Sequence, residues 1–292
     1  MSSDYLNVEK ECLATARRGV NWMLSQQAPD GSWKALDKAP VDAYYKAAWA
    51  FIITGETVAA ERTLNYVRDN LLQPDGDFLP RNDPWYTTVH YQYANAWILT
   101  GAQKQGRYDV AAPALRFLLT QQDPWNGGFY SLKGSATQRK RTDTMSSGIA
   151  GVSLLAAGQL EASRRLASYF DWIAHAQPDP QSKFYLTADE NGHLVTEFPA
   201  DEAFWRVVDT KQKDQCWYAV GLPFTFSTLL YQATGEKHYW DIAKWYFDFQ
   251  SRCVNPWDGG SSGKAGWGCS VNYRITGDTK YRDIALRVAK NQ

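Results

Sequence analysis

The sequence lacks several features that would narrow its function at once. No apolar run approaches the roughly 20 residues that a helix needs to cross a membrane, so we expect no membrane span. The 31 basic residues balance 31 acidic ones, which leaves no charge excess to attract nucleic acid or an anionic lipid surface. The first residues carry acids where a signal peptide would carry its apolar stretch, so the sequence indicates a cytoplasmic protein.

Cysteine is also scarce, and its spacing carries no motif. A chain of 292 residues can bury a large apolar core without disulfides, so free thiols in a reducing compartment are expected. No C-x-x-C pair occurs among the four cysteines, which are Cys12, Cys216, Cys253 and Cys269.

Aromatic residues, in contrast, are abundant, with 13 Trp and 17 Tyr, and a repeated pattern organises the chain. Glycine is the expected residue at a helix C-terminus, because it enters the left-handed conformation without strain. An amphipathic helical pattern follows each copy of the repeat. In each copy an apolar segment ends in a small residue and a glycine, at Gly55, Gly101, Gly158, Gly235 and Gly277.

The segments before these glycines carry few charges and many small residues, so they should be helices buried on most sides. Alternation of buried and amphipathic helices predicts an all-α fold, an α/α toroid of about six hairpins in one domain over residues 1–292. Five inner and six outer helices are recognisable, and a further inner helix is possible near 200–212. The outer-to-inner loops are long, which places function on their rim. The longest loop contains a predicted β-hairpin over 183–197.

A second repeat lies in these long loops, where Asp or Asn and Gly precede an aromatic residue. In its first copy Arg18-Gly19, Trp22-Met23 and Gln27 come before Gly31-x-Trp33. This copy resembles the QW motif of squalene-hopene and related triterpene cyclases. The chain is therefore similar to the α/α-toroid superfamily of terpenoid cyclases and protein prenyltransferase β subunits. Such motifs brace the scaffold, so the resemblance implies the fold more than the chemistry.

The sequence also departs from that superfamily. The D-x-D-D acid motif of triterpene cyclases is absent. Prenyltransferases hold zinc on an Asp-x-Cys pair and a distant His; Asp214 and Cys216 resemble the pair, but His238 falls on an outer helix. Zinc needs three or four ligands, so we expect no metal and no cofactor. Sugar-active α/α barrels (glycosidases, uronate lyases and N-acylglucosamine epimerases) are a second resemblance, through T-G-[ED] turns and a tryptophan-lined cleft.

The catalytic candidates begin the inner helices. His90 is the strongest, because a helix N-terminus disfavours imidazolium and keeps a neutral base near pH 7. Alternatively, it is a core histidine bonded to a neighbouring tyrosine. Asp42, Asp143 and Asp214 begin three other inner helices, where Asp is also an ordinary N-cap. Lys264 lies in the first turn of the fifth.

Aromatic residues gather near the same helix starts and are predicted to line a cavity. Their rings could stack on a flat substrate or stabilise a cation. Cys216 could act as an acid or a nucleophile, although a cysteine in a packed helix is more often an apolar filler. The predicted substrate-binding residues are Tyr44, Tyr45, Tyr91, Tyr93, Cys216, Trp217, Tyr218 and Trp267.

The leading hypothesis is a metal-independent acid–base cyclase, isomerase or lyase acting on an apolar, isoprenoid-like small molecule. In it His90 and Asp143 exchange protons, and Asp42 or Asp214 orients them. The alternative is a carbohydrate-active enzyme (glycoside hydrolase, epimerase or polysaccharide lyase), in which two of the same aspartates act as acid and base. A third possibility is a non-catalytic toroid that binds a peptide. The sequence leaves the oligomeric state open.

Overall fold

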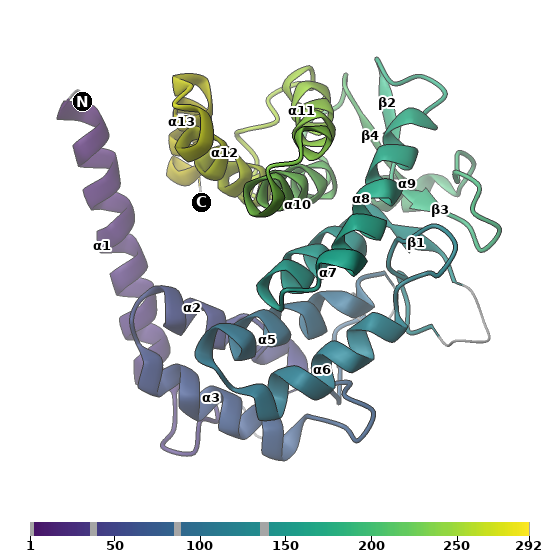
Figure 1. Cartoon of the computed structure of the whole chain (residues 1–292). Helices are drawn as coiled ribbons and strands as arrows, with labels where there is room; N and C mark the ends of the chain where they lie inside the picture. The colour runs from purple at the N-terminus through teal and green to yellow at the C-terminus, as the bar shows by residue number, and fades with distance from the viewer. Residues whose placement is uncertain (1–2, 36–39, 85–88, 135–139, 292) are drawn as a thin grey trace.

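The computed structural model describes residues 3–35, 40–84, 89–134 and 140–291, and these form the predicted α/α toroid (Figure 1). The inner helices of this part of the chain are α2 (Ala47–Ile53), α5 (Tyr91–Gln105), α7 (Thr144–Ala156), α10 (Tyr218–Thr234) and α12 (Gly263–Thr276). The outer helices are α1 (Ser3–Gln26), α3 (Thr57–Asn70), α6 (Tyr108–Thr120), α8 (Leu160–His175), α11 (Lys237–Ser251) and α13 (Thr279–Lys290).

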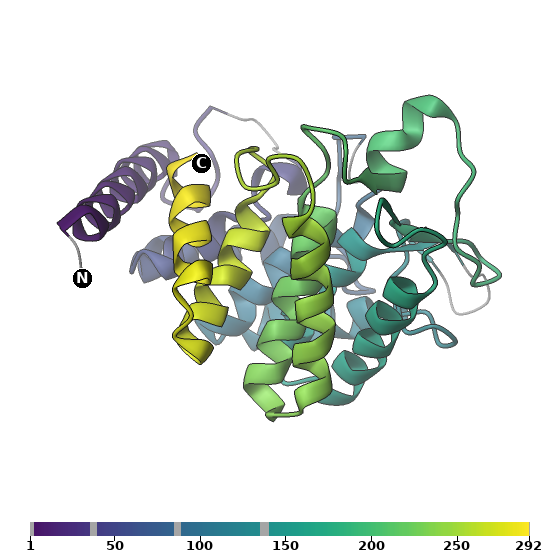
Figure 2. The same ribbon diagram turned by 90° about the horizontal axis from the view of Figure 1, so that it is seen from above.

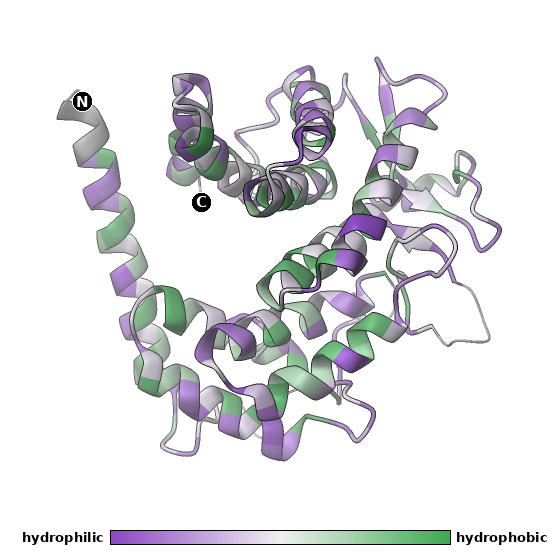
Figure 3. Ribbon diagram, in the orientation of Figure 1, coloured by the Kyte–Doolittle hydropathy of each residue, from purple (hydrophilic) through white to green (hydrophobic). Residues whose placement is uncertain are grey.

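Sequence composition explains the two helix classes. The inner helix α7 contains no charged residue and is buried over most of its length, whereas the outer helix α8 alternates polar and apolar positions, as Figure 3 shows. Small residues bring the inner helices close together. A Cβ atom on Gly148 or Gly151 of α7 would collide with Leu222 or Phe226 of α10. The pattern of small residues therefore sets the width of the inner wall.

Glycine ends four of the five inner helices as predicted, and one expectation is wrong. Gly101 does not end its helix; it lies inside α5, where a Cβ atom would stand 3.1 Å from that of Ala48 in α2. Close packing of two inner helices accounts for this glycine, and α5 ends instead at Gly106, with φ 75°. Left-handed conformations follow the other inner helices at Gly55, Gly158, Gly235 and Gly277.

The glycine turns of the long loops brace the outer helices. Gly31, Gly76 and Gly127 all have φ between 81° and 91°. A Cβ atom on any of them would collide with a main-chain carbonyl oxygen of the following outer helix, in α3, α6 and α8 respectively. Only glycine allows this approach of main chain to main chain.

Side chains of the same turns complete the bracing. Trp33 donates its indole N–H to the carbonyl oxygen of Ala43 and stacks on Tyr44. Gln27 and Gln122 donate side-chain hydrogen bonds to main-chain carbonyls of α3 and α8. The loop residues that resemble a QW motif are therefore structural.

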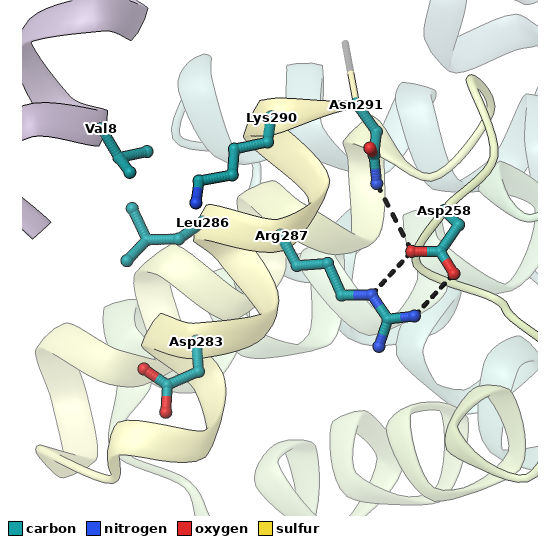
Figure 4. A pocket seen from close by; sticks show the side chains of 7 residues that line it. All are labelled: Val8, Asp258, Asp283, Leu286, Arg287, Lys290 and Asn291. Atoms are coloured by element: carbon teal, nitrogen blue, oxygen red, sulfur yellow. Dashed lines mark hydrogen bonds and ion pairs between the residues drawn. The ribbon is translucent and has the colours of Figure 1, made fainter. Parts of the chain in front are cut away.

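The ring is open on one side. Consecutive inner helices from α2 to α12 pack against one another, but within the described chain α12 makes no extensive contact with α2. The outer helices α1 and α13 approach each other across this gap (Figure 1). A pocket lies at their seam, where Arg287 of α13 forms two hydrogen bonds of 2.6 Å with Asp258, and Asn291 lies nearby (Figure 4).

A largely apolar groove runs beside the gap, between α1 and α2. Trp22 and Met23 of α1 form one wall, and Ala47 and Ala50 of α2 form the other. Trp22 is 66% exposed, which is unusual for so large a ring. The groove ends near Lys46, at the polar end of α2.

The long loops lie on one rim and the short glycine turns on the other, as Figure 2 shows for the C-terminal half of the ring. The short elements of the rim are η1 (Val41–Ala43), β1 (Thr142–Asp143), β2 (Lys183–Tyr185), β3 (Thr187–Ala188), η2 (Ala200–Glu202), α9 (Ala203–Arg206) and β4 (Val207–Asp209).

Two predictions about this rim need correction. The hairpin over 183–197 reduces to one bridge between Ala188 and Leu194; instead β2 pairs with β4, and β3 pairs with β1. No inner helix forms within 200–212, because η2, α9 and β4 occupy this stretch. The described residues thus contain five inner helices for six outer ones. In this part of the chain, no helix has both the length and the apolar character for crossing a membrane.

Candidate functional site

The inner faces of the inner helices form a cluster of their own, apart from the core between inner and outer helices. Ala96 and Trp97 of α5, Ile149 and Val152 of α7, and Leu222 of α10 are its buried centre. Tyr45, Trp49, Tyr93, Tyr218 and Trp267 pack against this centre and remain partly accessible. These side chains pack together inside the ring of inner helices, a region here called the lumen, and the tyrosines come from the N-terminal ends of these helices or the residues just before them.

His90 occupies the position that the sequence predicts, at the N-cap of α5. Its Nε2 atom lies 3.4 Å from the hydroxyl oxygen of Tyr218, and its ring meets the ring of Trp205 edge to face at 5.5 Å. Burial lowers the pKa of His90, and the negative charge of Asp143 opposes this only in part. The imidazole is therefore neutral at pH 7 and is able to accept a proton.

Tyr218 and Cys216 both have raised pKa values. Burial, together with the neighbouring Cys216, raises the pKa of Tyr218 well above its usual value, so its hydroxyl remains a donor. Burial raises the pKa of Cys216 to about 12. Its Sγ atom lies 3.4 Å from Sδ of Met145 inside the core. A neutral, fully buried thiol is an apolar filler rather than a nucleophile.

Two lysines approach the same aromatic wall. Lys46, at the N-cap of α2, places Nζ 5.3 Å from the ring centre of Tyr93 and 5.8 Å from that of Trp97. Lys264, in the first turn of α12, places Nζ 5.3 Å from the Trp97 ring. Lys46 keeps access to solvent although protein surrounds it, as expected for a side chain in a lumen.

The lysines and Tyr93 alter one another's ionisation. Burial alone would raise the pKa of Tyr93, but the positive charges of Lys264 and Lys46 outweigh it and lower that pKa. Burial lowers the pKa of Lys264, and the charge of Lys46 adds to this effect. Burial would likewise lower the pKa of Lys46, but Tyr93 and Tyr45 outweigh it and raise that pKa.

The three predicted aspartates have structural surroundings. Asp143 is an N-cap: its Oδ1 accepts hydrogen bonds from the N–H groups of Met145 and Ser146, and its Oδ2 accepts one from the Ser146 hydroxyl. Asp42 holds the main chain of residues 82–83 through two N–H bonds of 2.9 Å. Asp214 is exposed with φ 52°, and α10 begins only at Tyr218. Asp42 lies in η1, and α2 begins only at Ala47, so the expectation that Asp42 and Asp214 begin inner helices is wrong.

Half of the predicted binding residues lie elsewhere. Tyr44 is buried in the main core, where it stacks on Tyr66 with ring centres 4.8 Å apart. Trp217 is 1% exposed and belongs to the same core, as does Cys216. Tyr91 donates a hydrogen bond of 2.6 Å to Asp77. Neighbouring positions of a helix face different sides. The sequence therefore predicted which part of each inner helix carries aromatic residues, but not which of these residues face the lumen. Tyr45, Tyr93, Tyr218 and Trp267 do line the lumen.

Asp77 is the centre of a buried polar cluster that sequence analysis missed, here called the Asp77 network. Its members are Asp77, Arg81, Tyr91, Asn95 and Lys133. Tyr91, Asn95, Arg81 and Lys133 all donate hydrogen bonds to the fully buried Asp77 carboxylate. Burial alone would raise the pKa of Asp77, but these donors and their charges lower it.

Sequence analysis also missed Lys46, Trp97 and Trp205 in the lumen. Lys46 had a signal, because it is the sole charge in the segment AYYKAAWAFII. Nothing local marked Trp205, which the rim helix α9 brings to His90. The other histidines, His175, His193 and His238, are exposed as expected.

The proposed zinc pair does not converge on one site, since Asp214 is exposed and the Cys216 thiol is buried against Met145. Across the described ranges, no group of three His, Cys, Asp or Glu side chains is arranged to hold a metal ion.

Comparison with known proteins places the chain by fold. No protein-family model and no curated protein matches the sequence. A solved structure of a D-mannose isomerase is similar with a TM-score of 0.68 and 13% identity, over 99% of this chain and 86% of that one. The family 76 α-mannanase of Bacteroides thetaiotaomicron is similar with a TM-score of 0.58 and 16% identity, over 85% and 72%.

A third similar structure is an inactive variant of an α-1,6-mannanase from Salegentibacter sp. HEL1_6, in complex with α-1,6-mannotriose. Its TM-score is 0.55 at 12% identity, over 96% of this chain and 83% of that one. The resemblance to sugar-active α/α barrels is thus confirmed for the fold, and the resemblance to terpenoid cyclases finds no support in these comparisons.

The leading prediction of an isoprenoid cyclase is therefore wrong. The similar structures are enzymes whose names refer to mannose and mannans. The lumen also offers a physical reason: two lysine amines, a histidine and two tyrosine hydroxyls lie at its polar end. Desolvating such groups against a hydrocarbon is costly, whereas the hydroxyls of a sugar can satisfy them.

Proposed function

We propose that this protein is a carbohydrate-active enzyme that moves a proton on its sugar substrate, as an isomerase, epimerase or lyase does. The observation that carries the proposal is the pairing of a neutral histidine with a protonated tyrosine in an aromatic-walled lumen: His90 Nε2 lies 3.4 Å from the Tyr218 hydroxyl. The sugar-active names of structures with the same fold support the substrate class.

Chemistry of this kind needs a base, an acid and stabilisation of a developing negative charge. His90, neutral because of its burial, would take a proton from the carbon beside the sugar carbonyl or carboxylate. Tyr218, whose raised pKa keeps it protonated, would donate to the sugar oxygen. Lys46 and Lys264 would stabilise the enolate-like intermediate by their charge.

Hydrolysis of a glycosidic bond is disfavoured by the aspartates. A glycosidase of the usual kind needs two carboxyl groups facing each other across the bond, roughly 5 to 10 Å apart. Asp143 uses both oxygens to cap its helix, Asp42 holds a loop and Asp214 lies in solvent. None of these three aspartates is therefore arranged as half of an acid pair.

Solvent deuterium exchange tests the proposal. The protein would be incubated in D₂O with a panel of aldoses, ketoses and uronates, and deuterium in the recovered sugar would be measured by NMR. We expect incorporation with at least one sugar. His90→Gln should lower its rate by about 10²- to 10⁴-fold, the range for loss of a general base.

His238→Gln, an exposed histidine on α11, is the matched control and should leave the rate unchanged. The acid limb of the wild-type pH profile should fall below the ordinary histidine value of about 6.5, because the pKa of His90 is lowered. Undiminished exchange in His90→Gln, or cleavage of α-1,6-mannotriose without exchange, would refute the proposal.

A further inference from the structure

The two lumen lysines come from the helices on either side of the gap in the ring. Lys46 belongs to α2 and Lys264 to α12, yet both reach the ring of Trp97, at 5.8 and 5.3 Å. Elements far apart in the sequence thus bring two amines of like charge to one wall of the lumen.

These amines differ from Lys133, a partly exposed lysine of the rim. Lys133 forms ion pairs of 3.0 Å with Asp75 and 2.9 Å with Asp77. Among the described residues, no carboxylate forms an ion pair with Lys46 or Lys264. Two neighbouring cations without a counter-ion repel each other, so an anion placed between them would be held by both.

The surroundings fit a sugar rather than a free ion. Tyr45 and Tyr93, which remain partly accessible, offer ring faces beside Lys46. Aromatic faces of this kind stack on the apolar face of a pyranose. The ring centres of His90 and Tyr93 are 6.4 Å apart, and Lys46 Nζ lies 5.3 Å from the Tyr93 ring centre, so the base and this amine lie close to the same tyrosine ring.

We infer that the substrate is a monosaccharide unit bearing a negatively charged substituent, a carboxylate or a phosphate, which Lys46 and Lys264 bind while His90 faces the reacting carbon. This inference rests on the proposed function, since it identifies the substrate class of the same lumen. It assigns to the two lysines a role in recognition, because no carboxylate of the described residues forms an ion pair with either of them.

Calorimetric titration at low ionic strength would test it, with D-glucose, D-glucuronate and D-glucose 6-phosphate as ligands. At least one anionic sugar should bind about tenfold more tightly than glucose, since hydrogen bonds between charged groups are stronger than neutral ones. The glucuronate and phosphate arms separate the two sources of charge. Acetate and inorganic phosphate serve as probes without a sugar and should bind more weakly than the corresponding sugar.

Variants connect the preference to the residues. Lys46→Met and Lys264→Met should each abolish most of the anionic preference, and Lys264→Gln is a second version that keeps a polar group. Lys244→Met, an exposed lysine of α11, is the matched control and should retain the preference. Thermal unfolding should show all four variants folded, with the Lys264 variants no less stable than the wild type, because they relieve the repulsion between Lys264 and Lys46.

Equal affinity for glucose and both anionic sugars would overturn the inference. So would an anionic preference that survives both lysine substitutions, or sugar-free anions that bind as tightly as the sugars. Binding and deuterium exchange are measured separately, so the two proposals fail in different ways. Deuterium exchange on neutral sugars alone would refute this inference but leave the proposed function intact. Binding of anionic sugars that depends on the lysines, without any deuterium exchange, would support this inference and refute the proposed function.

Discussion

Two polar clusters lie at the same end of α5 and differ in how their groups are satisfied. In the Asp77 network, one carboxylate accepts hydrogen bonds from four side chains, two of which are cationic. In the lumen, Lys46 and Lys264 have aromatic neighbours but form no ion pair with a carboxylate of the described chain. Tyr91 and Tyr93, two residues apart, belong to different clusters. A saturated cluster stabilises the fold, whereas an unsaturated one has capacity for a ligand.

Removal of the Asp77 carboxylate should have the largest effect on stability of the changes considered. Asp77→Ala should destabilise the protein by roughly 3–5 kcal/mol, because it leaves the buried Arg81 without its counter-ion. Asp75→Ala is the matched control, since Asp75 pairs with the same Lys133 but is half exposed; we expect at most about 1 kcal/mol. Urea unfolding measures both. Similar losses in the two variants would contradict a structural role specific to Asp77.

Acid should weaken the same network. The folded-state pKa of Asp77 is lowered, so its contribution is complete above the unfolded value of about 4 and is lost as the pH falls through the folded value. The stability difference between wild type and Asp77→Ala should therefore shrink below about pH 4. Unfolding at a series of pH values from neutral downward would show this. A constant difference across that range would indicate that the Asp77 charge is not responsible.

A third variant separates helix capping from catalysis at Asp143. Asp143→Ala should cost about 1 kcal/mol, whereas Asp143→Asn should retain most stability, because Asn is also a good N-cap. Both variants should shift the acid limb of the exchange profile to lower pH, since the Asp143 charge raises the pKa of His90. Loss of exchange at every pH in Asp143→Asn would instead identify a catalytic carboxyl.

The smallest effect is expected at Asp214. Asp214→Gly replaces an exposed residue at φ 52° with one suited to the left-handed conformation, so stability should change by no more than about 0.5 kcal/mol. Deuterium exchange should equal that of the wild type. A loss of exchange with unchanged stability would instead identify Asp214 as a catalytic residue.

The sequence predicted the architecture because the repeats are local. Helix-ending glycines and alternating inner and outer patterns need no knowledge of distant contacts, and most of them are found where expected. Gly101 is instructive: its sequence context is that of a C-cap, but its glycine serves contact with Ala48 of another helix. Local pattern cannot distinguish these two uses of glycine.

The residues of the candidate site were harder to predict, because the direction in which a helix side chain points depends on the tertiary structure. The structure places His90 at the N-cap of α5, at the helix start that the sequence predicts. Which of Tyr44 and Tyr45, or of Tyr91 and Tyr93, faces inward depends on the rotation of each helix in the ring. The lone charge of its inner segment, Lys46, was a more informative signal, since a charge in a buried helix needs a reason.

The glycine turns also affect which parts of such a ring can change in sequence during evolution. Gly31, Gly76 and Gly127 touch main-chain atoms of the next outer helix, and every sequence supplies these atoms. The pitch from one repeat to the next is thus independent of the lumen side chains. Evolution can exchange the lumen residues, and with them the reaction, while three small residues keep the circumference constant. A solved structure only 13% identical to this chain shares its fold.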